Sequence, residues 1–283
     1  MNERLLRKIL SMNQPTLLEF SYNLLKKKYG YKKIIKTKDY IMAAGDTPVA
    51  LIAHLDTVFI RQPRDIFYDR EECVMWSPDG LGADDRAGVY AIFQILETGL
   101  KPHIVFTTNE EKGCLGAIEI IKEHETFPFG KLKYIVQLDR QGADDSVFYN
   151  CNNPEFEKYI NSYGFRKHIG SFSDISVLAP QWQAAAVNLS VGYIYEHEEI
   201  EHLYTVALEM TIGKVTQMLQ EIDKAEYYEY IPAKTRGLRG SVGIIDLPPV
   251  EFAPGQCEWC GEKIEKPNDL GLCEECYNIF IKY

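Results

Sequence analysis

The sequence predicts an α/β fold, a three-layer α/β/α sandwich with a mostly parallel mixed central sheet, followed by a small C-terminal module that contains four cysteines. Short apolar segments of strand character alternate with segments of helical periodicity along residues 1–230. Such alternation is typical of helices that cover both faces of a parallel sheet. The module is predicted by four cysteines gathered in residues 256–283. Residues 231–255 lose periodicity and accumulate Pro and Gly, as expected of a linker or irregular arm.

The predicted elements follow one another in a regular order. Two helices come first, and the second ends at LLKKKYG near residue 30. Apolar runs predict strands at 49–56, 73–77, 103–110, 133–139 and 185–192. Helical periodicity predicts helices at 84–99, 116–124 and 153–165. A last helix over about 200–221 closes the domain, with an apolar face made of Leu203, Val206, Ala207, Met210 and Ile212.

The composition narrows the class of protein. The chain has 31 Lys and Arg against 41 Asp and Glu, a net charge of -10, so no global basic field favours nucleic acid as a partner. No apolar run reaches the ~20 residues that span a bilayer, and the N-terminal segment has the pattern of an amphipathic helix. The odd total of seven cysteines fits reduced thiols. We therefore expect a cytoplasmic protein with no membrane partner.

The C-terminal cysteines have the spacing of a structural metal site. CEWC and CEEC supply Cys257, Cys260, Cys273 and Cys276, which is the pattern of a tetrahedral thiolate zinc site. The module resembles a zinc ribbon. Because so short a segment contains little apolar material, metal binding would supply the free energy of folding. A structural role is favoured, and recognition of a partner is the alternative. The acidic residues around the cysteines disfavour nucleic acid.

Two motifs place metal-binding residue types next to predicted strands. In HLD, His54 and Asp56 point the same way on a strand, so Asp56 can orient the imidazole while the other ring nitrogen binds a metal. In GLGADDRAG, Asp84 and Asp85 sit at a helix start, where one carboxylate can bridge two divalent cations. The alternatives are a satisfied His–Asp pair and a helix N-cap.

Two further regions add acids and a histidine. TTNEEKG brings Glu110 and Glu111 to a strand end; because neighbouring strand residues face opposite sides, one would hold metal and the other would act as general base. A solvated turn is the alternative. Asp139 ends another strand, and His197 follows the last one. All these residues lie at the predicted carboxyl ends of strands, where open α/β sheets form their ligand crevice.

These motifs, taken together, resemble a known group of enzymes. HLD, GADDRAG, NEEKGCLGA, Asp139 and GYIYEHEEIE occur in the order found in the metallopeptidase clan of co-catalytic zinc exopeptidases, clan MH, over residues from about 4 to 222. The clan contains aminopeptidases, carboxypeptidases and deacylases. The resemblance implies that Asp84 bridges two metal ions. It further implies that His54 and Asp139 complete one metal site, and Glu111 and His197 the other.

The resemblance also assigns supporting roles. It implies that Glu110 is the general base, that Asp56 orients His54, and that the Asp84–Asp85 peptide bond is cis. His202 is a rival to His197 as the last ligand, but the clan pattern of a histidine shortly after a Gly-Tyr strand end favours His197.

The expected function is hydrolysis of a peptide bond near a chain end, of aminopeptidase type, with two zinc ions that cobalt or manganese can replace. The alternatives are an N-acyl amino acid or small-amide deacylase, and a catalytically weak adaptor that binds a partner through the four-cysteine module. Residues 140–196 leave no room for the lid domain of many clan members, and residues 55–83 none for the barrel of others. The sequence leaves the oligomeric state open. Ser171, Ser173 and Asp174 are candidates for the pocket lining.

Overall fold

A computed structural model of the protein describes residues 1–233. These residues form one compact unit, Met1–Ala233. Most of the predicted linker and the whole predicted zinc module lie outside the described residues, including Cys257, Cys260, Cys273 and Cys276. Within the described part of the chain, no helix is both long and apolar enough to span a membrane.

The chain starts with two helices that begin at asparagine caps. The Asn2 side chain accepts a hydrogen bond from the Leu5 amide at the start of α1 (Glu3–Leu10), and Asn13 accepts one from Thr16 at the start of α2 (Gln14–Asn23). Each cap satisfies a backbone donor that has no partner inside the helix. A π-helical turn, η1 (Leu24–Lys28), extends α2.

The central sheet has eight strands in the order β1-β2-β6-β3-β7-β10-β8-β9. Its middle is formed by four mutually parallel strands, β6 (Pro102–Thr107), β3 (Thr47–His54), β7 (Tyr134–Arg140) and β10 (Ala186–Ser190). The outer strands are β1 (Ile34–Lys36), β2 (Tyr40–Ala43), β8 (Asp145–Val147) and β9 (Arg166–Lys167). The pairs β1–β2, β2–β6 and β10–β8 are antiparallel, so the sheet is mixed but mostly parallel at its centre.

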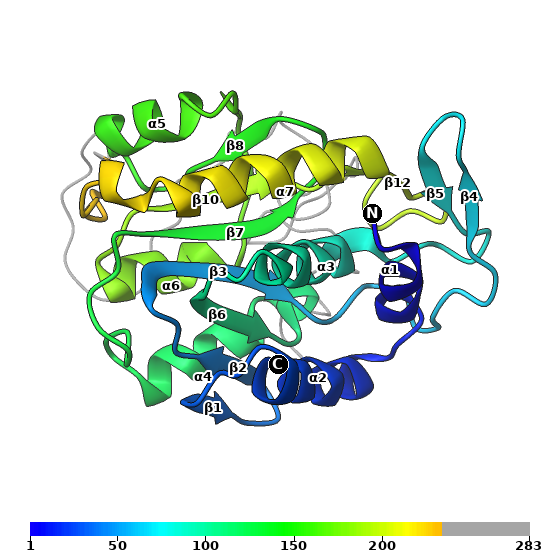
Figure 1. Ribbon diagram of the computed structural model, residues 1–283, viewed down its shortest axis with the longest axis horizontal. Helices are drawn as coiled ribbons and strands as arrows, with labels where there is room; N and C mark the ends of the chain where they lie inside the picture. Colours follow the sequence, from blue (N-terminus) through cyan, green and yellow to red (C-terminus); the bar gives the residue numbers. More distant parts are fainter. Residues whose placement is uncertain (234–283) are drawn as a thin grey trace, which may run out of the picture. The chain divides into compact units, whose positions relative to one another are not determined.

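Helices cover both faces of this sheet (Figure 1). α3 (Ala83–Glu97) and α7 (Thr205–Gln220) pack on one face, and α4 (Leu115–Glu123) and α6 (Asp174–Trp182) on the other. Strand β3 shows why two hydrophobic layers form: its apolar residues alternate between the two buried clusters, with Leu51 in one and Ile52 in the other. α5 (Pro154–Asn161) and η3 (Ile222–Lys224) complete the unit. The predicted α/β sandwich is confirmed.

A second, four-stranded sheet has the order β11-β12-β5-β4. The hairpin β4 (Phe67–Asp69) and β5 (Val74–Trp76) lies between His54 and Asp84 in the sequence. It pairs through β5 with β12 (His202–Tyr204), which pairs in turn with β11 (Tyr193–Ile194). This sheet ties the segment that carries His197 to the segment that follows His54.

The predicted start of the last helix was wrong. Residues 202–204 form β12 because they pair with β5, so the helix begins at Thr205. Of the predicted apolar face, Val206 and Met210 are each 51% exposed, whereas Ala207 is buried and Ile212 packs against the core.

The strand predicted over 103–110 was too long. β6 ends at Thr107, and Asn109 has a left-handed backbone with φ 53° that turns the chain into the short helix η2 (Glu110–Lys112). Strand alternation therefore does not explain how Glu110 and Glu111 diverge. Helix α6 was not predicted from the sequence, and neither were the short strands β1, β2, β4, β8, β9, β11 and β12.

Candidate active site

Five side chains from five separate segments meet at the carboxyl end of the parallel strands. His54 is the last residue of β3, Asp139 lies near the end of β7, and Glu111 lies on η2 just after β6. Asp84 lies in the first turn of α3, and His197 follows β11. These five side chains and that of Glu110 line one small cavity of about 130 Å³. The crevice therefore lies where the parallel sheet was expected to form it.

The two oxygens of Asp84 face different imidazoles. Its Oδ1 lies 3.1 Å from Nε2 of His54, and its Oδ2 lies 3.2 Å from Nε2 of His197. His54 Nε2 is also 3.4 Å from Oδ1 of Asp139, and His197 Nε2 is 3.0 Å from Oε2 of Glu111. Two groups of three ligand atoms thus share one carboxylate.

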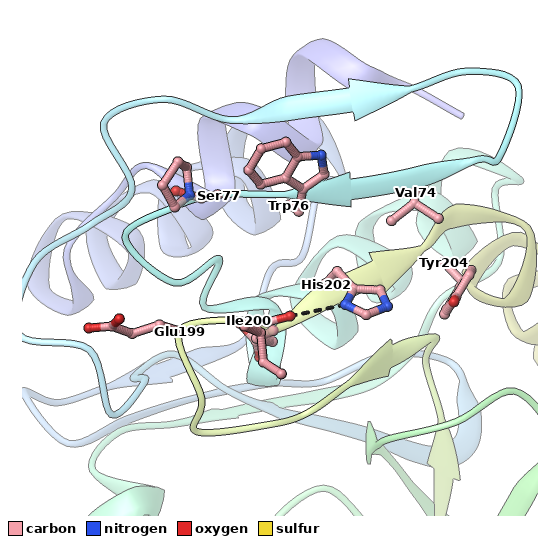
Figure 2. Close-up of a pocket in the computed structure, with 9 residues that line it drawn as sticks. Val74, Trp76, Ser77, Glu199, Ile200, His202 and Tyr204 are labelled. Carbon is pink, nitrogen blue, oxygen red and sulfur yellow. Dashed lines mark hydrogen bonds between the residues drawn. The ribbon is translucent and has the colours of Figure 1, made fainter.

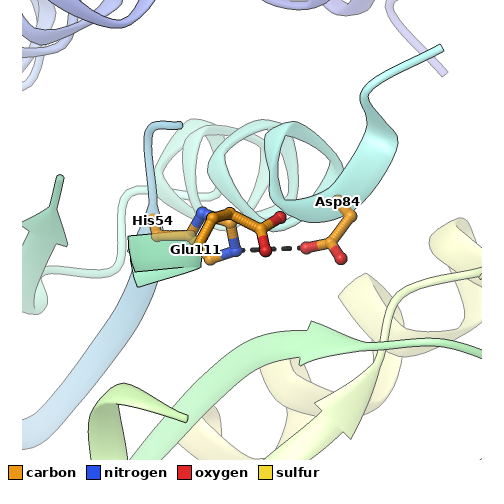
Figure 3. Close-up of side chains that lie close together, drawn as sticks. All are labelled: His54, Asp84 and Glu111. Atoms are coloured by element: carbon orange, nitrogen blue, oxygen red, sulfur yellow. Dashed lines mark hydrogen bonds and ion pairs between the residues drawn. The ribbon is translucent and has the colours of Figure 1, made fainter. Parts of the chain in front are cut away.

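These distances fit metal ligation. Ligand atoms about 2.0–2.2 Å from a tetrahedral zinc ion lie about 3.3–3.6 Å from one another, close to the 3.0–3.4 Å observed between the histidine nitrogens and the carboxylate oxygens. The ligand atoms of His54, Asp84 and Glu111 lie within 4.8 Å of one another, and Figure 3 shows these three side chains converging. Glu111 Oε1 is buried without a hydrogen-bond partner among the described residues. The nitrogen and oxygen donors suit zinc and similar divalent ions.

Asp56 lies behind His54 and holds three groups at once. Its Oδ1 is 3.3 Å from Nδ1 of His54, the ring nitrogen that faces away from the other ligands. The same carboxylate accepts hydrogen bonds from the backbone amides of Glu110 and Glu111, each 3.1 Å long. Burial alone would raise the pKa of Asp56, but His54 and these two amides lower it. Asp56 therefore orients an imidazole and also fixes the start of η2.

Asp85 also lies close enough to His54 and Asp139 to form a metal-binding group with them. Its carboxylate is already engaged, however, because it accepts hydrogen bonds from the backbone amides of His54 at 3.0 Å and Gly88 at 3.1 Å. We therefore assign it to holding the backbone of β3 against α3. The Asp84–Asp85 peptide bond is cis, as the resemblance implied.

Asp139 is held by a polar network on its outer side. Gln137 and Ser173 each donate a hydrogen bond of 2.9 Å to its Oδ2, and Tyr193 donates one of 3.1 Å to its Oδ1. The Asn188 side chain fixes the backbone, because it accepts from the amide of Asp139 and donates to its carbonyl. These contacts leave the Oδ1 atom facing His54, so the network sets how Asp139 points into the cavity.

Glu201 is the last residue of the GYIYEHEEIE motif, and no role was predicted for it from the sequence. It is fully buried, and its carboxylate accepts hydrogen bonds from the backbone amides of Ala83 at 2.9 Å and Asp84 at 3.1 Å. Burial and the nearby Asp84 carboxylate raise its pKa to about 8. It thus positions the turn that presents Asp84. Its sequence signal was its place in that motif, directly before what proved to be strand β12.

Glu110 shares the cavity but belongs to neither ligand group. Burial raises the pKa of its carboxyl group, and Asp139 and Asp174 raise it further. Its Oε1 accepts a hydrogen bond of 3.5 Å from the thiol of Cys114. Of the candidate lining residues, Ser171 does line the cavity, whereas Asp174 lies fully buried beside Thr107.

His202 lies away from the cluster, in a shallow groove of the second sheet (Figure 2). Its Nδ1 is 3.0 Å from the carbonyl oxygen of Ile200, and its ring packs edge-on against Tyr204. The structure therefore brings His197, and not His202, to the cavity. Trp76 and Tyr204 leave this groove partly apolar, each being about 40% exposed.

A parallel α/β sandwich with histidines and carboxylates converging at its strand ends defines a metal-dependent hydrolase. Residues 35–176 match peptidase family M28, and this chain belongs to that family. The match contains His54, Asp84, Glu111 and Asp139 and stops before His197. Membership implies co-catalytic metal ions and makes the protein a metallopeptidase.

Solved structures with a similar fold include peptidases from bacteria and archaea. A tripeptidase from Staphylococcus aureus covers 77% of this chain and 96% of its own, with 13% identity and a TM-score of 0.61. The aminopeptidase PepT from Bacillus cereus covers 78% and 98%, with 14% identity and a TM-score of 0.60. An aminopeptidase from Desulfurococcus kamchatkensis covers 79% and 95%, with 14% identity and a TM-score of 0.56. No curated protein sequence matches this chain.

Proposed function

We propose that this protein is a dinuclear zinc exopeptidase of aminopeptidase type. The observation that carries the proposal is the shared carboxylate: Asp84 turns one oxygen towards His54 and the other towards His197. In this arrangement His54 and Asp139 would hold one ion with Asp84, and Glu111 and His197 would hold the other. Cobalt or manganese would serve in place of zinc, because carboxylates are tolerant ligands.

The residues around the cluster have separate tasks in the proposed reaction. When bound, the divalent ions polarise the scissile carbonyl and lower the pKa of a coordinated water molecule. Glu110, which lines the same cavity and is not needed as a ligand, accepts a proton from the attacking water and passes it to the leaving amine. Asp56 keeps the His54 ring in place through its Nδ1 and holds the backbone of Glu110 by a hydrogen bond of 3.1 Å.

Proteins with a similar fold support a short peptide as the substrate. The fold is shared with a tripeptidase and with aminopeptidases, which agrees with a short peptide as substrate. For the cysteine tail we propose one structural zinc ion held by Cys257, Cys260, Cys273 and Cys276.

The Glu110→Gln variant tests the proposed base. It keeps the shape of the side chain and removes its basicity, so we expect zinc content to stay unchanged and kcat on a peptide substrate to fall about 10²–10⁴-fold. Glu119→Gln is the matched control, because Glu119 lies on α4 away from the cavity and pairs there with Lys122. Undiminished turnover in Glu110→Gln would remove this residue from the mechanism.

Metal analysis and a substrate panel test the rest of the proposal. About three zinc ions per chain are expected, two in the cluster and one in the tail, and a content of about one would contradict the dinuclear site. Peptides with free amino ends, peptides with blocked carboxyl ends and N-acyl amino acids should be compared. Cleavage of the N-acyl compounds alone would replace the aminopeptidase proposal with a deacylase.

A further inference from the structure

Glu196 is an acidic side chain in the active-site cavity that the metal cluster does not use. It lines the cavity next to His197, yet it forms no ion pair with a histidine among the described residues. Its Oε1 accepts a hydrogen bond of 2.6 Å from the side-chain amide of Gln141. Gln141 is itself anchored, because its carbonyl accepts a hydrogen bond of 2.6 Å from the Ser190 hydroxyl. One carboxylate oxygen is thus fixed and the other is left for a ligand.

The backbone around Glu196 is shaped to present it. Tyr195 and His197, on either side, both have left-handed backbones with φ values of 58° and 68°. A residue other than glycine seldom adopts this conformation, which costs about 1 kcal/mol or more and is concentrated at functional sites. These two left-handed residues change the direction of the chain after β11. The consecutive side chains of Glu196 and His197 therefore both line the same cavity.

The charges of the cavity favour a cationic ligand at this position. Two divalent ions would balance the carboxylates of Asp84, Glu111 and Asp139 together with that of Glu110. Glu196 then remains as a carboxylate that lines the cavity and that pairs with no Lys, Arg or His within residues 1–233. Arg140 also lines the cavity, but its nearest carboxylate partner is another residue: its Nε lies 3.8 Å from Oδ2 of Asp145 on β8.

We propose that Glu196 binds the α-ammonium group of the substrate and thereby restricts the enzyme to peptides with a free amino terminus. This inference rests on the proposed peptidase function and adds the residue that reads the substrate end. An ammonium group donates charge-assisted hydrogen bonds to a carboxylate, whereas an N-acyl group has no charge and would leave Glu196 unpaired. Discrimination against N-acyl substrates follows from the same contact.

The test compares Glu196→Gln with Glu198→Gln, an exposed neighbour on the same segment that does not line the cavity. With a leucine anilide as substrate, we expect KM to rise about 10–100-fold in Glu196→Gln, as for the loss of one charged hydrogen bond. kcat should stay within about threefold, because the proton-transfer group is untouched. Glu198→Gln should match the parent protein. An unchanged KM in Glu196→Gln overturns the inference.

A binding measurement separates this inference from the proposed function. Butylamine carries the ammonium group alone, so calorimetric titration of the zinc-loaded protein reports on Glu196 even without turnover. We expect butylamine to bind at least tenfold more weakly to Glu196→Gln than to Glu198→Gln, with equal zinc contents. Equal butylamine affinities refute the role of Glu196, whereas a parent protein that cleaves no peptide but shows this loss of affinity refutes only the proposed peptidase activity.

Discussion

Removing Asp56 should damage the site without removing a proposed ligand. In Asp56→Ala, the backbone amides of Glu110 and Glu111 lose the acceptor that each contacts at 3.1 Å, and His54 Nδ1 loses its only nearby carboxylate among the described residues. A hydrogen bond to a charged group contributes about 1.5–3 kcal/mol, so we expect the free energy of unfolding to fall by about 3–5 kcal/mol. Asp56→Asn keeps one acceptor oxygen and should lose about half as much.

Urea unfolding of the zinc-free protein measures this effect. Asp79→Ala is the control, because Asp79 pairs with Arg64 at the surface and such pairs contribute less than about 1 kcal/mol. Zinc affinity should fall about 10–100-fold in Asp56→Ala, as for other groups that orient a histidine ligand. An Asp56→Ala protein with the parent zinc affinity and a free energy of unfolding within about 0.5 kcal/mol of the parent would refute this role of Asp56.

Acid should remove the difference between the parent protein and Asp56→Asn. Because the contacts of Asp56 hold its pKa below the ordinary value of 3.8, the unfolded chain takes up the proton at higher pH than the folded one. The stability that the ionised form contributes is complete above pH 3.8 and is lost as the pH falls through the lowered pKa. The free-energy difference between the two proteins should therefore shrink only at pH values below about 3.8.

Two further predictions concern histidines. His197→Ala should lower zinc affinity at least tenfold, as measured by competition with a chelator. His202→Ala should leave the affinity unchanged, because that ring lies in the groove of the second sheet. Equal losses of affinity in the two variants would contradict the assignment of His197 as a ligand. Burial lowers the pKa of His103 to about 4, so the unfolded chain binds a proton between pH 6.5 and 4 that the folded one does not. Stability should fall by about 2–3 kcal/mol as the pH drops over this range, and the fall should be absent in His103→Asn, as followed by urea unfolding.

Much of the fold could be predicted from the sequence because its central strands are buried on both faces. The segment around Leu51 and Ile52 is an apolar run bounded by polar residues, and such runs belong to central parallel strands. The short edge strands were missed because they carry no such run; Arg166 and Lys167 in β9, for example, are both exposed. Pairing partners decide these strands, and local sequence does not encode them.

The candidate site was predictable to the extent that its residues lie in compact motifs. His54, Asp56 and Asp84 could be picked out from neighbouring residues alone, and the structure brings them together. Glu201 and Asn188 could not, because each acts on a backbone group far away in the sequence. The strand assignment of 103–110 also failed at its end, since the left-handed turn at Asn109 is set by its surroundings. The cysteine tail stays a prediction.

The second sheet has a consequence for the order in which the site can assemble. The loop that carries His197 connects β11 to β12, which pair with each other, and β12 also pairs with β5, a contact that joins residues 202–204 to residues 74–76. Pairings between segments so far apart in sequence form late, because the loop between them must close first. Metal ions bound by both groups of ligands would link strand β3 to a segment made much later in synthesis. By binding the folded chain alone, they would stabilise the pairing of these distant segments, and the stability of the fold would rise with the concentration of free metal ion.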